Sequence, residues 1–161
     1  AEGWNHRDAP EALREAFADF GGPVPGWLGA VRDLWLWGLF RHPVATQWHD
    51  GAGRAALLGD AAHPTLPFMA QGANMALEDA ACLASRLSRE ADSSTALARY
   101  AASRAPRTRA IVEMANRNAR DYHLRPPLAP LAHGLLRGIG KLAPGLALKR
   151  FGWIFDHDAT L

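Results

Sequence analysis

The sequence predicts an α/β fold in which one or two sheet strands are followed by a mostly α-helical C-terminal region. Three observations predict it. Residues 33–40 are dense in aromatic and aliphatic side chains, as strands are. Residues 54–60 form a short apolar run ending in Gly-Asp, which suits a strand buried on both faces of a parallel sheet. From residue 74 onward, apolar residues recur at helical spacing.

Two short helices are expected before the first strand. Residues 10–20 have apolar side chains at helical spacing, with Asp8 as a candidate N-cap and Pro10 in the first turn. A Gly-Gly-Pro sequence ends this helix, and a second one is expected from about residue 25 to residue 31.

Longer helices are expected after the second strand. A turn at residues 50–53 precedes that strand, and a helix is predicted over residues 74–89. The next helix starts near Ser93 and runs to about Arg120, with an interruption at Pro106. Residues 125–150 are rich in Pro, Gly and Leu, which predicts short helices with frequent breaks.

Length and composition limit the class of protein. The 161 residues are enough for one domain or a piece of a larger protein, and the first Met is Met69, so we expect a trimmed chain or the tail of a longer one. The single cysteine, Cys82, excludes an internal disulfide and fits the cytoplasm. The sequence has neither a signal-peptide pattern nor an apolar run long enough for an integral membrane segment.

The charge distribution is uneven. The net charge is +2, and basic residues outnumber acidic ones between residues 104 and 150. These basic residues lie along predicted helices without interleaved aromatic residues or a nucleic-acid-binding motif. We therefore expect a solvated helix face or the neighbourhood of an anionic cofactor, and no nucleic-acid partner.

The Gly-Asp pair at the end of the predicted strand indicates a ligand site. Ligands of open α/β sheets collect beyond the carboxyl ends of the strands. Asp60 lies at such an end, and its ionised carboxylate only accepts hydrogen bonds, so it suits a sugar or ribityl hydroxyl rather than a phosphate. Gly59 allows a ligand or a neighbouring backbone to approach closely.

The loop that follows leads to a helix start. Two prolines, Pro64 and Pro67, stiffen the loop, and residues 71–74 open the helix. A helix N-terminus presents N–H groups without intrahelical acceptors and a partial positive charge. These groups can stabilise negative charge on a bound ring system such as a reduced flavin.

The residues from Gly59 to Pro67, the Gln-Gly-Ala-Asn sequence at 71–74 and the Glu-Asp-Ala sequence at 78–80 together resemble the second FAD motif of single-component (class A) flavoprotein monooxygenases. Within that family the chain is most similar to salicylate-hydroxylase-like enzymes. The resemblance implies that the α/β fold is a partial FAD/NAD(P)-binding domain, Rossmann-like and of the aromatic hydroxylase type.

The resemblance also implies roles for individual residues. Asp60 would contact the ribityl chain, and Pro67 would lie beside the reactive face of the flavin and shape it without acting as an acid or base. The backbone amides at the helix start would contact the pyrimidine edge. The implied cofactor-binding residues are Gly59, Asp60, Gln71, Gly72, Ala73 and Asn74. Ala70 departs from the family pattern, which usually has glycine there, and implies a mild loss of loop flexibility.

Other parts of the family pattern extend or limit the resemblance. Trp48, Tyr100, Arg104 and residues 152–158 also look like the C-terminal part of these enzymes. The Gly-x-Gly-x-x-Gly sequence that would hold the FAD pyrophosphate does not occur in the chain. We therefore expect residues 1–48 to be the end of a substrate-domain region, and residues 49–161 to be the C-terminal part of an FAD-binding domain with a helical tail. This chain alone is expected to bind FAD weakly or not at all.

The function implied by the resemblance is that of an FAD-dependent monooxygenase. Such an enzyme uses NAD(P)H as reductant and hydroxylates a small aromatic substrate resembling a phenolic acid. The chain would be a C-terminal fragment or one part of a split enzyme, with an upstream half or a second chain as partner. The alternative is a truncated, non-catalytic paralogue that acts as a binding module or completes a flavin site with another chain.

Several residues have competing interpretations. His63 suits a loop residue packed near the sheet better than a metal ligand with His42 or His49, and no metal site is expected. A hydrolase built on Asp60 and His63 lacks a nucleophile motif. Three tryptophans suit a core better than a substrate surface: Trp35, Trp37 and Trp48.

Three further features also have a structural explanation. Glu78 and Asp79 are expected to complement the helix dipole, or Asp79 to pack structurally, rather than to act as a catalytic pair. Cys82 is expected to be a small core residue. The apolar run from Leu128 to Leu148 is expected to pack against protein rather than to lie on a membrane, because its prolines and glycines break a continuous face.

Overall fold

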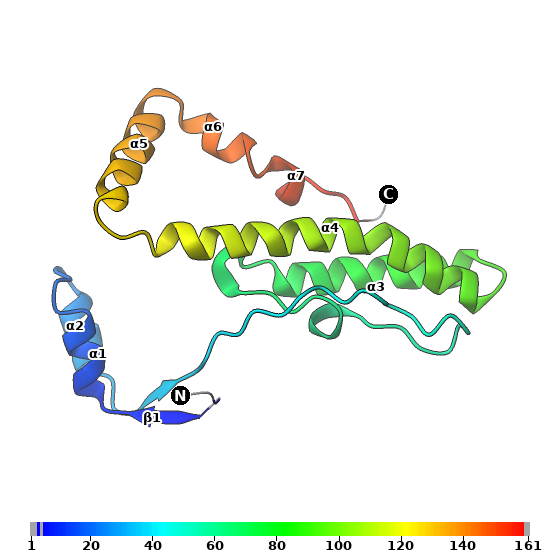
Figure 1. The fold of residues 1–161 in the computed structure, drawn as a ribbon, viewed down its shortest axis with the longest axis horizontal. Coiled ribbons are helices and arrows are strands. Elements are labelled where there is room, and N and C mark those ends of the chain that lie inside the picture. Colours follow the sequence, from blue (N-terminus) through cyan, green and yellow to red (C-terminus); the bar gives the residue numbers. More distant parts are fainter. Residues whose placement is uncertain (1–2, 4, 160–161) are drawn as a thin grey trace. The chain divides into compact units, whose positions relative to one another are not determined.

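The structure, a computed structural model, describes residue 3 and residues 5–159. The chain divides into two compact units, Ala1–Phe40 and Arg41–Leu161. Figure 1 shows the elements in chain order, from blue at the N-terminus to red at the C-terminus.

The first unit contains a two-stranded antiparallel sheet and two short helices. Strand β1 (His6–Asp8) pairs with strand β2 (Leu34–Leu36), so that Arg7 lies opposite Trp35. Between the strands come helix α1 (Pro10–Ala16) and helix α2 (Val24–Gly29). Both predicted helices and the strand predicted within residues 33–40 are therefore present, although the first helix and the strand are shorter than expected.

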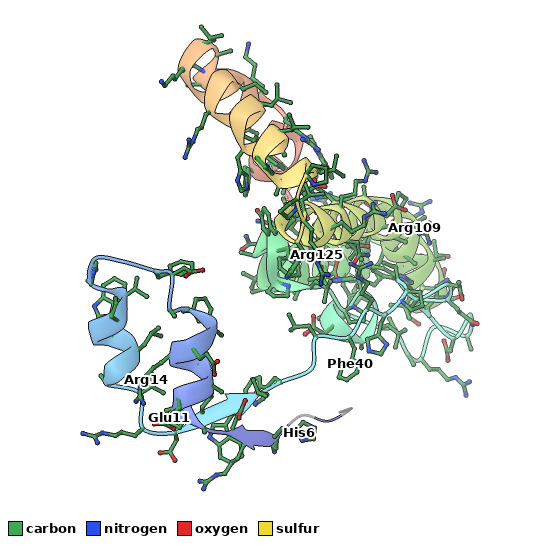
Figure 2. The ribbon with its side chains drawn as sticks, turned by 60° about the vertical axis from the view of Figure 1, so that its left-hand side comes forward. His6, Glu11, Arg14, Phe40, Arg109 and Arg125 are labelled. Carbon is green, nitrogen blue, oxygen red and sulfur yellow. The ribbon has the colours of Figure 1, made fainter. Side chains whose placement is uncertain are left out.

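Arg14 joins the two helices of this unit. Its Nη1 bonds Glu11 at 2.7 Å, and both residues lie on α1 (Figure 2). Its Nε and Nη2 donate to the carbonyls of Leu28 and Val31, each at 3.3 Å. One side chain thus donates to carbonyl groups at and just after the end of α2, where carbonyls lack the N–H donor of a following helical turn.

The second unit is built on two long helices. Helices α3 (Gly72–Arg89) and α4 (Ser93–Tyr122) run along each other (Figure 1). Asp92 caps α4, because its Oδ1 accepts the N–H of Thr95 at 2.8 Å. Two 3-10 turns precede α3, and three shorter helices follow α4: η1 (Gly59–Ala61), η2 (Pro67–Met69), α5 (Leu128–Leu142), α6 (Pro144–Lys149) and α7 (Gly152–Phe155).

Two apolar clusters form the core of this unit. One cluster joins α3, α4 and α7 through Met75, Ile111, Val112 and Ile154. The other packs residues on both sides of η1, Trp48 before it and Ala62 after it, against Tyr100 of α4. Trp48 is thus a core residue as expected, whereas the side chains of Trp35 and Trp37 in the first unit are exposed.

The strand predicted over residues 54–60 is not formed in the described part of the chain. Its regular pairing is limited to one isolated bridge between His49 and Ala56, closed by the predicted turn at residues 50–53. Leu57 donates its N–H to the carbonyl of Trp48 at 2.8 Å, and Gly59 already belongs to η1. The prediction was wrong because a buried parallel strand requires neighbouring strands on both sides, which depend on residues far away in sequence.

The helix pattern was predicted correctly over α3 but not at Pro106. Helix α4 continues through Pro106, whose ring is exposed. The missing N–H removes one helical hydrogen bond, but buried side chains on both sides of the proline, including Arg104 and Thr108, hold the helix in place. The frequent breaks predicted after residue 125 were also wrong in part, since α5 is a helix of 15 residues.

Candidate functional site

The second unit contains an open groove of about 660 Å³ before and along the start of α3. Its walls come from η1, the loop that follows, η2 and the first turns of α3. The lining residues are Leu58, Gly59, Asp60, Thr65, Leu66, Pro67, Ala70, Gly72, Ala73 and Ala76. Five of the seven residues singled out in the sequence therefore lie around one groove: Gly59, Asp60, Pro67, Gly72 and Ala73.

The two remaining residues, Gln71 and Asn74, line a neighbouring cavity of about 340 Å³. Gln71 is buried, and its Oε1 accepts a hydrogen bond from Asn74 Nδ2 at 3.4 Å. The C-terminal segment also lines this cavity through Phe155 and His157. The start of α3 thus borders both the groove and this second cavity, and each predicted residue lines one of the two.

Gly59 begins the turn that carries Asp60 into the groove. Its φ of +59° lies in the left-handed region, which glycine occupies without the steric cost that other residues incur. A Cβ at this position would lie 3.2 Å from the Cβ of Ala76 on α3. The glycine therefore allows both the turn and the close approach of η1 to α3, and the neighbouring Asp60 stays exposed.

The start of α3 supplies hydrogen-bond donors to the groove. Gln71 is the N-cap residue, and Gly72 and Ala73 form the first helical positions and line the groove. Their N–H groups have no acceptor within the helix. Because the first turn has no acidic side chain, the partial positive charge of this helix end is available to a ligand.

Ala70 has a left-handed backbone, with φ 52° and ψ 30°. It is the C-cap of η2 and lies two residues before α3. An alanine in this conformation costs on the order of 1–2 kcal/mol relative to its usual regions. The substitution noted in the sequence therefore affects backbone strain in the loop rather than only its flexibility.

A buried ionic cluster lies directly behind the groove. Asp79 on α3 is fully buried, and its Oδ2 lies 2.6 Å from Nε2 of His63, which is fully buried as well. Its Oδ1 accepts a hydrogen bond from Nε of Arg104 on α4 at 2.7 Å. The same Oδ2 accepts the backbone N–H of Gly59 at 3.1 Å. One carboxylate thus joins two helices and the turn that carries Asp60.

A second carboxylate extends the cluster to the C-terminal segment. Glu78 lies 2.7 Å from Nη1 of Arg104 and accepts two hydrogen bonds from Arg107, each at 2.8 Å. Arg107 also donates to the backbone carbonyls of Trp153 and Ile154, at 2.9 Å and 3.0 Å. The two arginines therefore link α3 and α4 to α7.

The environment favours the ionised form of both carboxylates. Burial alone raises the pKa of Asp79, but hydrogen bonds from His63, Arg104 and the Gly59 N–H more than offset it, so the pKa is lowered. Burial likewise raises the pKa of Glu78, and the guanidinium groups of Arg107 and Arg104 bring it below its usual value. Burial, followed by the negative charge of Asp79, raises the pKa of Tyr100.

The sequence did not predict the cluster as a unit. Asp79 was expected to complement the helix dipole or to pack structurally, and it is a buried ion-pair partner. A signal was present, because Asp79 follows Met75 by one helical turn and therefore lies on the buried stripe of α3. Arg104 follows the buried Tyr100 by one turn of α4 in the same way. A charge on each of two apolar stripes predicts a buried pair.

The structure offers other site types little support. Among residue 3 and residues 5–159, no three His, Cys, Asp or Glu side chains are grouped so that they could hold a metal ion. His63 is a loop residue with Asp79 as partner. None of the helices in the described residues is long and apolar enough to cross a membrane.

Comparisons with known proteins identify relatives of the chain. Residues 24–115 match the FAD binding domain family. The chain is 45% identical over 126 residues to 3-hydroxybenzoate 6-hydroxylase 1 of Aquipseudomonas alcaligenes, covering 77% of this chain and 30% of the relative. It is 36% identical over 160 residues to 3-amino-4-hydroxybenzoate 2-monooxygenase PtmB3 of Streptomyces platensis, covering 99% of this chain and 39% of the relative.

A solved structure supports the same relationship. The chain resembles a salicylate hydroxylase in a substrate complex with a TM-score of 0.74 and 28% sequence identity, over 99% of this chain and 38% of that one. The likeness confirms the predicted fold class, a partial FAD-binding domain with few strands and mostly helical content. The chain spans about a third of the length of the curated relatives it matches.

Proposed function

Because the chain belongs to the FAD binding domain family, among relatives that are aromatic-ring monooxygenases, we propose that it supplies the ring- and ribityl-binding half of an FAD site. The family match and the likeness to a salicylate hydroxylase confirm the resemblance to salicylate-hydroxylase-like flavoproteins. The enzyme of which this half is part would use NAD(P)H and hydroxylate a small aromatic compound resembling a phenolic acid.

The residues around the groove fit this part of FAD. Asp60 presents an exposed carboxylate, which can accept hydrogen bonds from ribityl hydroxyl groups. The N–H groups at the start of α3 suit the electron-rich pyrimidine edge of the flavin ring. The observation that carries the proposal is that both kinds of group line the same groove, with Gly59 allowing its walls to approach.

The protein residues would hold and orient the cofactor. Asp60 would fix the ribityl chain, and the amides of Gly72, Ala73 and Asn74 would stabilise negative charge at the ring. Pro67 would shape the surface beside the reactive face, since its ring restricts the backbone of η2. Bound FAD would supply the redox chemistry, taking electrons from NAD(P)H and passing them to O₂.

Gln71 would act from behind the ring-binding amides. It is buried at the N-cap position of α3, its backbone carbonyl accepts the N–H of Met75 at 2.8 Å, and its side chain bonds that of Asn74. It would therefore set the orientation of the first helical turn.

The predicted division of the chain is part of the proposal, with residues 1–48 as the end of a substrate-domain region and residues 49–161 as part of the FAD-binding domain. In support, the groove lies wholly within the second unit. A cytoplasmic location stays a prediction from the single Cys82.

Ligand competition tests the cofactor part of the proposal. Riboflavin contains the ring and the ribityl chain, whereas ADP contains the adenosine and pyrophosphate parts of FAD. In titrations of the purified chain followed by flavin fluorescence, riboflavin and FAD should bind with similar, weak affinity, and ADP should not displace them.

Asp60→Asn should weaken the affinity for riboflavin and for FAD by about tenfold, the equivalent of about one charge-assisted hydrogen bond. The exposed Asp121→Asn on α4 is the control. Displacement by ADP, or an unchanged affinity of the Asp60 variant, would contradict the proposal.

A chimera tests the catalytic part. The chain's matching region replaces the corresponding 126 residues of the Aquipseudomonas 3-hydroxybenzoate 6-hydroxylase. The chimera is expected to retain FAD and to oxidise NAD(P)H with formation of a hydroxylated aromatic product. The Asp60→Asn chimera should lose FAD during gel filtration. A folded chimera without FAD would show that this groove does not serve a flavin.

A further inference from the structure

Asp79 lies where three separate parts of the chain meet. It receives hydrogen bonds from the loop residue His63, from Arg104 on α4 and from the backbone of Gly59 in η1. Its side chain and that of His63 are 0% exposed, and that of Arg104 is 4% exposed. Water therefore does not compete for these bonds, and the position of the carboxylate is set by its three donors.

The bond to Gly59 is the one that reaches the groove. Gly59 is buried and left-handed, and its N–H is directed at Asp79 Oδ2 from the residue that immediately precedes Asp60. The carbonyl of Gly59 accepts the N–H groups of Ala62 and His63, each at 2.9 Å. Both the N–H and the carbonyl group of Gly59 are thus hydrogen-bonded, directly before Asp60.

We propose that Asp79 is a positioning residue for the flavin site: held by Arg104 and His63, its carboxylate fixes the Gly59 turn and thereby sets where Asp60 presents its own carboxylate in the groove. The inference rests on the proposed flavin function only for the role of Asp60. The link between Asp79 and the Gly59 turn is tested without any ligand.

The three donors explain why a carboxylate is needed. An asparagine at position 79 has the same shape, but it has one acceptor oxygen and one NH₂ group. If its oxygen faced Gly59 and His63, its NH₂ group would face the Nε donor of Arg104. If it were turned round, the NH₂ group would face the Gly59 N–H. Either orientation places two donors against each other in a buried site. The Gly59 N–H loses its acceptor in the second orientation, and in the first orientation Arg104 no longer holds that acceptor, so Asp79→Asn should loosen the turn.

His63 has a complementary role. Its Nε2 faces Asp79, while its Nδ1 is buried and has no hydrogen-bond partner among the described residues. The ring also packs against Trp48, with ring centroids 5.6 Å apart. The bond to Asp79 is therefore the hydrogen bond that the described residues give this imidazole. That bond holds Asp79 Oδ2 beside the Gly59 N–H.

Amide hydrogen exchange tests the positioning directly. In the full 161-residue chain, Asp79→Asn should accelerate exchange of the Gly59 amide by about tenfold or more relative to wild type. The amides of Ile111 and Val112 in α4 report global opening, and the acceleration at Gly59 should exceed theirs. Asp121→Asn is the matched control and should change neither. Equal acceleration at both places would overturn the inference, because it would show a merely structural role.

A double-mutant cycle on riboflavin affinity tests whether Asp79 acts through Asp60. Asp60→Asn and Asp79→Asn should each weaken binding by about tenfold, and the double variant should be no weaker than the Asp60 variant alone. Multiplying losses would overturn the inference. If the wild-type chain binds no riboflavin and the chimera retains no FAD, the proposed function fails, and hydrogen exchange still decides the role of Asp79.

A pair of His63 variants covers the case in which Asp79→Asn does not fold. Gln places an N–H donor close to the position of Nε2, whereas Leu has none. His63→Gln should keep the Gly59 amide protected to within about threefold of wild type, and His63→Leu should expose it by about tenfold. The same protection in both variants would overturn the inference.

Discussion

The Gly59 N–H and the Asp79 carboxylate are joined by a buried hydrogen bond of 3.1 Å across 20 residues of sequence. The bond connects the turn that carries Asp60 to the middle of α3. Arg104 binds the other oxygen of the same carboxylate at 2.7 Å, so the bond also ties the groove to α4. One set of charges thus contacts α3, α4 and the turn that bears Asp60.

Removal of the guanidinium of Arg104 should have the largest effect on stability. Arg104→Gln leaves Asp79 and Glu78 close together without the cation that both contact. Breaking a buried ion pair on one side costs about 3–5 kcal/mol. We expect a loss of that order in the free energy of unfolding, measured by urea titration and circular dichroism.

The control for this variant lies on the same helix. Arg109, labelled in Figure 2, is exposed on α4, and Arg109→Gln should change stability by less than about 0.5 kcal/mol. Similar losses in the two variants would show that the buried cluster has no special role in stability.

The sequence predicted the helices and the site residues for different reasons. Helix α3 was predictable because its apolar periodicity persists over 18 residues, and its start was predictable because a proline-stiffened loop followed by glycine marks a helix start locally. Both of these signals depend on residues that are near one another in the chain. Asp60, in contrast, was assigned to a ligand site from the end of a strand that the structure does not form, and Pro67 from the family resemblance.

The features that escaped prediction depend on distant residues. The apolar run at residues 54–60 has the composition of a strand, but its pairing requires neighbours that local composition does not reveal. The bond between Gly59 and Asp79 also requires the fold before the two residues meet. Helix α4 continues past Pro106 because packing on both sides outweighs one lost hydrogen bond, a balance that a sequence pattern does not contain.

Relief of backbone strain at Ala70 should stabilise the protein. Ala70→Gly removes the side chain from a left-handed position with φ 52°. We expect a gain of about 1 kcal/mol in the free energy of unfolding, offset in part by the greater freedom of glycine in the unfolded chain. Thermal unfolding followed by circular dichroism measures it.

A glycine inside α3 provides the contrast. Ala81 is exposed in the helix interior, where Ala81→Gly should lower stability by about 1 kcal/mol. Opposite signs for the two alanine-to-glycine changes are expected. A loss at both positions would show that Ala70 is not strained.

Stability should fall in acid because of the same carboxylates. The pKa values of Asp79 and Glu78 are lowered in the folded chain, so their ionised forms stabilise it above the unfolded pKa values of about 4. This contribution is lost as the pH falls through the folded pKa values. The free energy of unfolding should therefore decrease steeply below about pH 4. In Glu78→Gln this decrease with falling pH should be shallower. Asp121→Asn is the control and should keep the wild-type dependence of the unfolding free energy on pH. The same dependence in the wild type and both variants would exclude the buried cluster as the cause of the acid sensitivity.

Arg107 should control whether the C-terminal segment stays docked on the long helices. Its guanidinium binds Glu78 twice and the carbonyls of Trp153 and Ile154. A lysine at this position keeps the charge, but its single ammonium cannot reproduce the fork of donors. Arg107→Lys should lower stability by about 1–3 kcal/mol. It should also accelerate amide hydrogen exchange in α7 more than at Ile111 in the core of α4.

The control for this variant is Arg109→Lys, on the exposed side of α4, which should leave exchange in both regions unchanged. If exchange in α7 stays at the wild-type rate in the Arg107 variant, the apolar contacts of Ile154 hold the segment by themselves.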